Sequence, residues 1–154
     1  AALSATASGP DNLALAHALS AAVSAAIAYR PGVTHAHTTA AEALALGEGV
    51  CQDHAHALIA CARSRGIPAR YVSGYLFATE DGAPHEAAHA WAELYIPGLG
   101  WVGFDPANRT CPDAGYIRLG SGFDAQDAAP IRGIARGGAR EAMDVTVAVQ
   151  QSAQ

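Results

Sequence analysis

The hydrophobic positions in the first third of the chain follow a helical spacing. Apolar residues three to four positions apart predict a helix over 12–29, with Asp11 as its N-cap. Thr39 and Glu42 match a capping box, in which two residues satisfy each other's backbone N–H groups, and predict a short helix ending near Leu46. Both helices therefore come before any strand pattern.

The spacing changes after a third predicted helix over 51–65. Its expected core face consists of Ala55, Leu58, Ile59 and Ala62. Beyond this helix apolar and polar residues alternate, which is typical of strands with one buried face. The predicted strands are 69–77, 88–96, 101–105 and 143–149. The run 107–138 is rich in loop-forming residues and predicts no element. Helices followed by a largely antiparallel sheet indicate an α+β fold.

The composition of the chain excludes several classes of function and says less about the fold. The chain has 154 residues and a formal net charge of −5, which suits one domain with a hydrophobic core and provides no basic surface for nucleic acid. All nine basic residues are arginines, so the absence of lysine excludes a Schiff-base mechanism, a Walker-type phosphate loop and a role as amine donor in an isopeptide cross-link. No apolar run is long and unbroken enough to predict a membrane helix.

Three residues combine into a set that supports nucleophilic catalysis. Cys51 stands at the predicted start of the third helix, where unsatisfied backbone N–H groups and the helix dipole stabilise a thiolate. His89 and Asp105 lie on two strand-like segments that a short turn joins into a hairpin. A nucleophile, a base and an acid that orients the base are the three parts of a catalytic triad. We therefore predict that these three residues form a catalytic site.

Four segments around these residues carry a specific resemblance. They are GVCQD at 49–53, GIPARYVSGY at 66–75, HAWAE at 89–93 and GWVGFDP at 100–106. With these motifs in this order, the chain resembles the bacterial transglutaminase-like superfamily, a group often described as cysteine proteases. The similarity covers roughly residues 38–135, because 129–133 also resembles a late family segment.

The resemblance implies a papain-like core, in which the helix headed by the cysteine packs on an antiparallel sheet that carries the histidine and the acid. It also implies thiol-dependent acyl transfer on an amide bond of a peptide or protein, through a thioester, by a peptidase, an amidase or a transglutaminase. We expect no cofactor and no metal. His54 stands where the family more commonly has an aromatic residue, which leaves the role of this position open.

The groups around the triad are less defined. The backbone N–H of Cys51 is one expected oxyanion donor, because it lies at a helix start. The candidates for the second donor are Gln52, Tyr71 and Tyr75. Trp91 follows His89 by two residues on the same strand face, so it either lines the cleft or packs in the core.

Two other interpretations stay open. The chain has seven histidines, and Cys51 and His54 are three residues apart on one predicted helix, so a Cys/His zinc-binding protein is a rival, although no CxxC pair is present. A catalytically inactive binding module of the same fold is the second rival, although all three triad residues are present. Each triad residue also has a structural alternative: a buried small side chain for Cys51, a hydrogen-bonded strand residue for His89 and a turn cap for Asp105.

The sequence also suggests an organisation and a location. We expect a helical lead-in over 1–37 packed on a transglutaminase-like catalytic domain over 38–154, and a chain trimmed from a longer protein. Three cysteines are an odd count, and no signal peptide is visible, so we expect a reducing, cytoplasmic location. A peptide or protein substrate is the expected partner, with neither nucleic acid nor membrane. The oligomeric state is open, with a monomer favoured.

Overall fold

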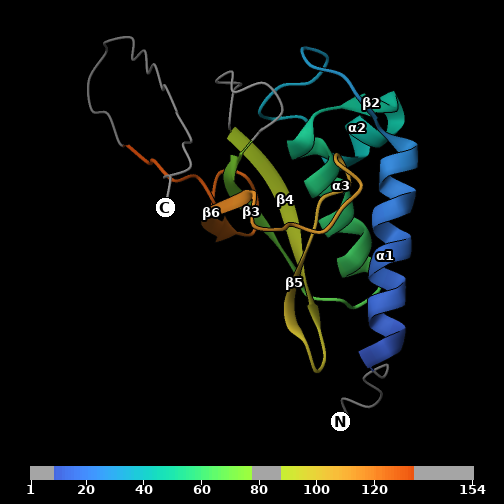
Figure 1. The fold of residues 1–154 in the computed structure, drawn as a ribbon. Helices are drawn as coiled ribbons and strands as arrows, with labels where there is room; N and C mark the ends of the chain where they lie inside the picture. Colours follow the sequence, from blue (N-terminus) through green and yellow to red (C-terminus); the bar gives the residue numbers. More distant parts are fainter. Residues whose placement is uncertain (1–8, 78–87, 134–154) are drawn as a thin grey trace, which may run out of the picture.

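The computed structural model describes residues 9–77 and 88–133. This part consists of three helices, a four-stranded sheet and a pair of two-residue strands (Figure 1). In chain order the elements are α1 (Gly9–Ala26), β1 (Ala28–Tyr29), α2 (Ala40–Leu46), β2 (Glu48–Gly49), α3 (Cys51–Ser64), β3 (Ala69–Leu76), β4 (Ala88–Ile96), β5 (Gly100–Phe104) and β6 (Tyr116–Gly122). The α+β class predicted from the pattern and the resemblance is confirmed.

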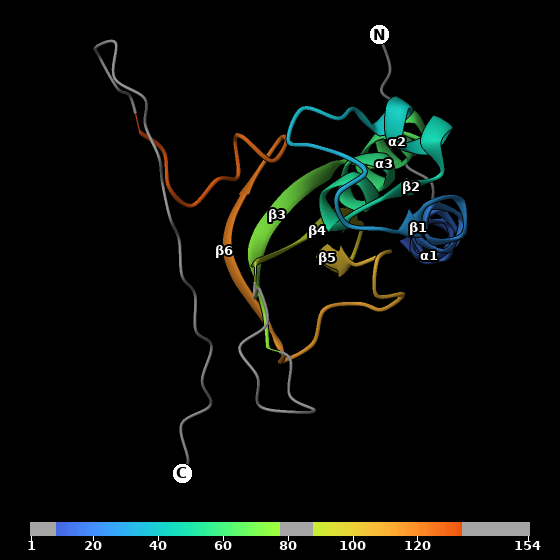
Figure 2. The ribbon, with the colours of Figure 1, turned by 90° about the horizontal axis from the view of Figure 1, so that it is seen from above.

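The main sheet is antiparallel and has the strand order β5-β4-β3-β6. Trp91 of β4 lies opposite Val72 of β3, and Ala92 lies opposite Phe104 of β5. α3 packs on β3 and β4, and α1 and α2 pack in turn on α3 (Figures 1 and 2). The predicted hairpin of β4 and β5 is present, and it carries two of the three predicted triad positions at or beside its strand ends.

α3 forms the centre of the hydrophobic core. Its buried apolar residues are Ala55, Ala57, Leu58, Ile59 and Ala62, which include all four residues predicted from the spacing. Leu94, Ile96 and Phe104 of the sheet belong to the same core cluster. The alanines on α3 allow the helix to approach the sheet closely, since a short side chain keeps two backbones near each other while apolar surface is still removed from water.

A short parallel strand pair holds the segment before α3. Ala28 and Tyr29 of β1 pair with Glu48 and Gly49 of β2. The Arg30 backbone N–H also donates to the Gly49 carbonyl at 2.8 Å. These bonds join the chain after α1 to the turn that leads into α3, although neither strand was predicted.

The capping box of α2 is confirmed in both directions. The Glu42 backbone N–H donates to Thr39 Oγ1 at 3.3 Å, and the Thr39 backbone N–H donates to Glu42 Oε2 at 2.8 Å. Gly47 ends the helix in the left-handed region, with φ of 73°.

Other predictions need correction or lie outside the described part. α1 begins at Gly9, so Asp11 is not its N-cap. β6 lies in the run 107–138, for which no element was predicted, because glycines interrupt its alternation. The predicted strand 143–149 lies outside the described residues. The division of the chain after residue 37 stays a prediction. Within the described residues, no helix combines the length and apolar character that crossing a membrane requires.

Candidate active site

Asp53 holds the turn that leads into α3. Its Oδ2 accepts the Val50 backbone N–H at 2.8 Å and the Thr34 hydroxyl at 2.6 Å. The carboxylate thus satisfies a donor at the helix start, where the dipole also favours a negative charge. A Cβ at Gly49 would lie 2.7 Å from Asp53 Oδ2, so this position needs a glycine. The turn therefore places Cys51 as the first residue of α3.

Cys51 lies partly exposed at the start of α3, and all three cysteines of the chain are free thiols. Backbone N–H groups at a helix start, together with the helix dipole, stabilise negative charge on a side chain there. α3 and β4 both begin toward the top of the molecule as drawn in Figure 1. Cys51 lies close enough to His89, the second residue of β4, to help raise the pKa of its imidazole.

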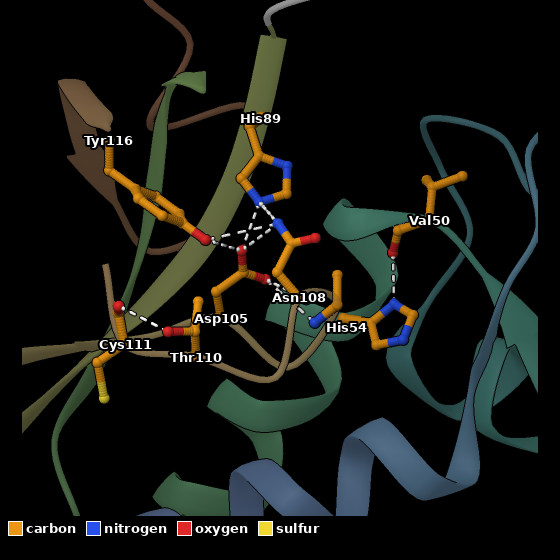
Figure 3. A network of polar contacts seen from close by, with 9 residues as sticks. Val50, His54, His89, Asp105, Asn108, Thr110, Cys111 and Tyr116 are labelled. Atoms are coloured by element: carbon orange, nitrogen blue, oxygen red, sulfur yellow. Dashed lines mark hydrogen bonds and ion pairs between the residues drawn. The ribbon is translucent and has the colours of Figure 1, made fainter. Parts of the chain in front are cut away.

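His89 is joined to Asp105, which directly follows β5. His89 Nε2 lies 2.6 Å from Asp105 Oδ2, and Nδ1 points away from the carboxylate (Figure 3). The exposed fraction is 9% for the His89 side chain and 0% for the Asp105 side chain. Because water is excluded, the electrostatic interaction between the two groups is stronger than at a surface. His89 and Asp105 therefore form one buried hydrogen-bonded pair, with Cys51 near the histidine.

The Asp105 carboxylate has four further donors. Oδ1 accepts the backbone N–H groups of Ala107 at 3.1 Å and Asn108 at 3.3 Å. Oδ2 accepts the Asn108 side-chain amide at 2.8 Å and the Tyr116 hydroxyl at 2.8 Å (Figure 3). A buried carboxylate needs such partners, because an uncompensated charge is costly away from water.

Asn108 and Tyr116 were not among the predicted site residues. Asn108 had a usable signal, since it stands three residues after an aspartate in an Asp-Pro turn, where side chains bond the local backbone. Tyr116 had none, because it comes from β6, for which the pattern predicts no element.

The protonation of His89 and Asp105 is coupled through this geometry. Burial disfavours a charged His89, but the hydrogen bonds and charges of Asp105 and Cys51 outweigh it and raise the pKa of His89 from 6.5 to about 9. Burial likewise disfavours a charged Asp105, but the bonds from His89, Tyr116 and Asn108 hold its pKa below the ordinary value. The arrangement therefore favours an imidazolium beside the Asp105 carboxylate near neutral pH.

The remaining predicted site residues lie in different surroundings. The Gln52 side-chain amide donates to the Ala36 carbonyl at 3.1 Å. Tyr71 is buried in the core with its ring centroid 4.9 Å from that of His56, and burial together with the nearby Cys51 charge raises its pKa. Tyr75 is half-buried on β3.

Trp91 is almost fully buried rather than open to a cleft. Its exposed fraction is 2%, and its ring stacks on His89 at a centroid distance of 6.3 Å. It meets the Tyr116 ring edge-on at 5.3 Å. The residue therefore supports the His89 side of the site from within the sheet.

His54 connects the start of α3 to the end of α1. Its Nδ1 lies 2.8 Å from the Val50 carbonyl and its Nε2 lies 2.9 Å from the Ile27 carbonyl. Both ring nitrogens thus face backbone carbonyl oxygens, so neither is directed at a metal shared with Cys51. Over residues 9–77 and 88–133, no three His, Cys, Asp or Glu side chains gather in a group that could hold a metal ion.

The family model of the transglutaminase-like superfamily core matches residues 1–106 of the chain. Among curated proteins, an uncharacterized protein of Mycobacterium leprae (strain TN) is 39% identical over 129 residues, which cover 81% of this chain and 46% of that protein. A protein-glutamine gamma-glutamyltransferase of Pseudomonas aeruginosa is 35% identical over 71 residues, which cover 42% of this chain and 11% of that protein. The chain spans less than half the length of the curated relatives it matches.

Two solved structures are similar in fold. The crystal structure of a "putative cysteine protease" from Cytophaga hutchinsonii has a TM-score of 0.65 and 37% identity, and the match covers 74% of this chain and 37% of that one. Calcium-bound LapG of Legionella pneumophila has a TM-score of 0.57 and 16% identity, covering 80% of this chain and 72% of that one. The second likeness concerns the fold alone.

Proposed function

Because the chain belongs to the transglutaminase-like superfamily, we propose that it catalyses thiol-dependent acyl transfer on an amide bond of a peptide or protein. One observation carries the proposal: a buried contact of 2.6 Å joins His89 to Asp105, and Cys51 at the start of α3 lies near enough to His89 to contribute to its raised pKa. A nucleophile, its proton partner and an orienting acid are thereby in reach of one another.

The reaction begins with attack of Cys51 Sγ on the amide carbonyl carbon, which forms a tetrahedral oxyanion. The C–N bond then breaks, and His89 transfers its proton to the departing nitrogen, so that the amine leaves neutral and a thioester stays on Cys51. Water or a second amine attacks the thioester carbonyl and gives its proton to His89. The thiolate and the imidazolium are then restored.

Asp105 orients His89 in this scheme. Its Oδ2 accepts the Nε2–H, which leaves Nδ1 for the exchange of a proton with Cys51 and the leaving group. The carboxylate itself stays charged, since its donors hold its pKa low.

The oxyanion is assigned to the start of α3. The Cys51 backbone N–H is one donor by its position at the helix end. Gln52 is the second candidate, because one N–H of its amide is used by the Ala36 carbonyl and the other is available. Tyr71 is the weaker candidate, since it is buried in the core.

Two acceptors are compatible with the thioester: water, which makes the protein a hydrolase, and a primary amine, which makes it a transglutaminase. The similarity to the gamma-glutamyltransferase of Pseudomonas aeruginosa favours testing the second. Incubation with a glutamine-containing peptide and a fluorescent primary amine distinguishes them. Hydrolysis converts the glutamine to glutamate or cleaves the peptide, whereas transamidation attaches the dye, and ammonia leaves from the glutamine side chain whether that side chain is hydrolysed or transamidated. Cys51→Ala should abolish both outcomes while the circular dichroism spectrum stays unchanged.

The first test needs no substrate. Iodoacetamide alkylation is followed against pH with mass mapping of each cysteine, in the native protein and in His89→Ala. We expect Cys51 to react at a pH at which Cys111, whose pKa is raised by burial, stays unreactive. His89→Ala should remove this low-pH reactivity. A Cys51 that is inert, or that reacts like Cys61 and Cys111 in both proteins, contradicts the proposal and favours an inactive module.

A further inference from the structure

Three side-chain donors share one oxygen of the Asp105 carboxylate. His89 Nε2 lies 2.6 Å from Oδ2, while the Tyr116 hydroxyl and the Asn108 amide each lie 2.8 Å from it. Each donor withdraws some of the negative charge that the others use. The strength with which Asp105 holds His89 therefore depends on Tyr116 and Asn108.

Tyr116 is held in this place from across the sheet. It starts β6, at the opposite edge of the sheet from β5, and pairs with Leu76 of β3. Its ring meets Trp91 edge-on, with centroids 5.3 Å apart and planes at 90°, and lies 5.9 Å from the His89 ring. Trp91 can lie over β3 only because residue 74 is glycine, since a Cβ there would approach Trp91 Cη2 to 2.6 Å.

The direction of the Tyr116–Asp105 bond follows from chemistry. An ionised carboxylate only accepts, so the phenol must donate. Burial, together with the Asp105 bond and charge, raises the pKa of Tyr116 and keeps the hydroxyl protonated. The hydroxyl is therefore a permanent neutral donor to the oxygen that holds His89.

We infer that Tyr116 is a positioning residue whose hydroxyl shares Asp105 Oδ2 with His89 and thereby limits how firmly Asp105 retains the imidazolium proton. The inference rests on the proposed function, in which His89 must deliver that proton to a leaving amine. A carboxylate without this competing donor would hold the imidazolium more tightly. Tyr116 then balances orientation of His89 against release of its proton.

The charged and titratable groups that face His89 come from three parts of the fold. Within the described residues they are the Cys51 thiol from α3, Asp105 after β5, and Tyr116 of β6 with Asp113 acting on it. A substitution at Tyr116 leaves the other groups in place, so its effect on His89 is read through Asp105.

The test repeats the alkylation profile of Cys51 with Tyr116→Phe, which removes one oxygen and keeps the ring that contacts both Trp91 and His89. We expect the pKa of His89 to rise. The upper pH limit of the part of Cys51 alkylation that is lost in His89→Ala should therefore move upward by about 0.5 to 1 pH unit. Tyr95→Phe is the matched control, because Tyr95 lies on the same sheet, packs on Trp101 at 5.5 Å and should leave the profile unchanged.

Asn108→Ala provides a second arm, since it removes another donor to the same oxygen, together with amide contacts of 3.3 Å to His89 Nε2 and 3.5 Å to the Tyr116 hydroxyl, and should shift the profile in the same direction. If the native protein shows His89-dependent reactivity but neither variant moves its alkaline end, the inference is overturned and the proposed function stands. A fall in melting temperature with an unchanged profile in both variants means a structural role only. If the native protein shows no His89-dependent reactivity, the proposed function fails and the inference falls with it.

Discussion

At the scale of single residues, the site depends on positions that touch no substrate. Gly49 is the clearest case, because an added Cβ would lie 2.7 Å from Asp53 Oδ2 and 2.8 Å from Asp53 Cβ. Asp53 in turn accepts the Val50 N–H at the start of α3. The geometry of Cys51 therefore rests on the absence of a side chain two positions before it.

Gly49→Ala should displace Asp53 and shift the first turn of α3. We expect a loss of about 1–3 kcal/mol in the free energy of unfolding, as for other overpacked sites, together with weaker low-pH alkylation of Cys51. Urea unfolding and the alkylation profile measure the two effects. Gly133→Ala is the control, because a Cβ at Gly133 would meet no atom within 4 Å. Equal stability of the two variants would contradict the role given to Gly49.

Asp105→Asn tests the charge beside His89. The negative group that raises the pKa of His89 would be lost, so this pKa should fall by about 1–3 units from the value near 9. The alkaline end of Cys51 reactivity should therefore move downward, opposite to the shift expected for Tyr116→Phe. Asp127→Asn, at an exposed aspartate paired with Arg132, should leave the profile unchanged. An unaltered profile in Asp105→Asn would exclude Asp105 from the triad.

At the scale of elements, α2 is a short helix whose stability depends on its first turn. Thr39→Ala removes the acceptor of the Glu42 N–H and should reduce the free energy of unfolding by about 1 kcal/mol. Thr39→Ser keeps a hydroxyl at the same place and should recover most of the loss. Chemical denaturation of the two variants in parallel gives the comparison. Equal destabilisation by both substitutions would show that the cap bond contributes little.

The elements show where sequence patterns succeed. α3 and β4 were predicted within one residue at each end, because a helix with an apolar stripe and a strand with strict alternation are governed by local spacing. β1 and β2 were missed because two-residue strands exist only through their pairing. β6 was missed because its glycines fit the close approach of Asp127 and Ala128, which a pattern of hydrophobicity does not reveal.

The candidate site likewise contains residues with a local sequence motif and residues without one. Cys51, His89 and Asp105 each stand in a local motif, and the structure places His89 against Asp105, while the catalytic role of the three residues stays a prediction. Tyr116 was not predictable because its contact with Asp105 depends on strand order, with β3 and β4 lying between β6 and β5. Trp91, by contrast, packs within the sheet beside His89.

At the scale of the whole molecule, the free energy of unfolding should depend on pH through the protonation of His89. Its pKa is about 9 in the folded protein and 6.5 without partners, so folding favours the protonated form. The resulting stabilisation is fully present below about pH 6.5 and is lost as the pH rises through about 9, with an upper limit of about 3 kcal/mol. Urea unfolding of the native protein and of His89→Gln should therefore give curves that converge at alkaline pH. A difference that is constant with pH would contradict the charged pair.

The three proposed triad residues come from a helix start, a strand start and the turn after another strand, so the proposed chemistry requires that these segments have met. Long-range strand pairing forms later than local helices in most small proteins. The selective alkylation of Cys51 therefore reports when the domain has assembled. Brief pulses of alkylating reagent during refolding would label Cys51 selectively only after β4 and β5 have docked beside α3. If the proposed function holds, the same dependence means that a nascent or partly unfolded chain lacks acyl-transfer activity, which appears only when the domain around Cys51 is complete.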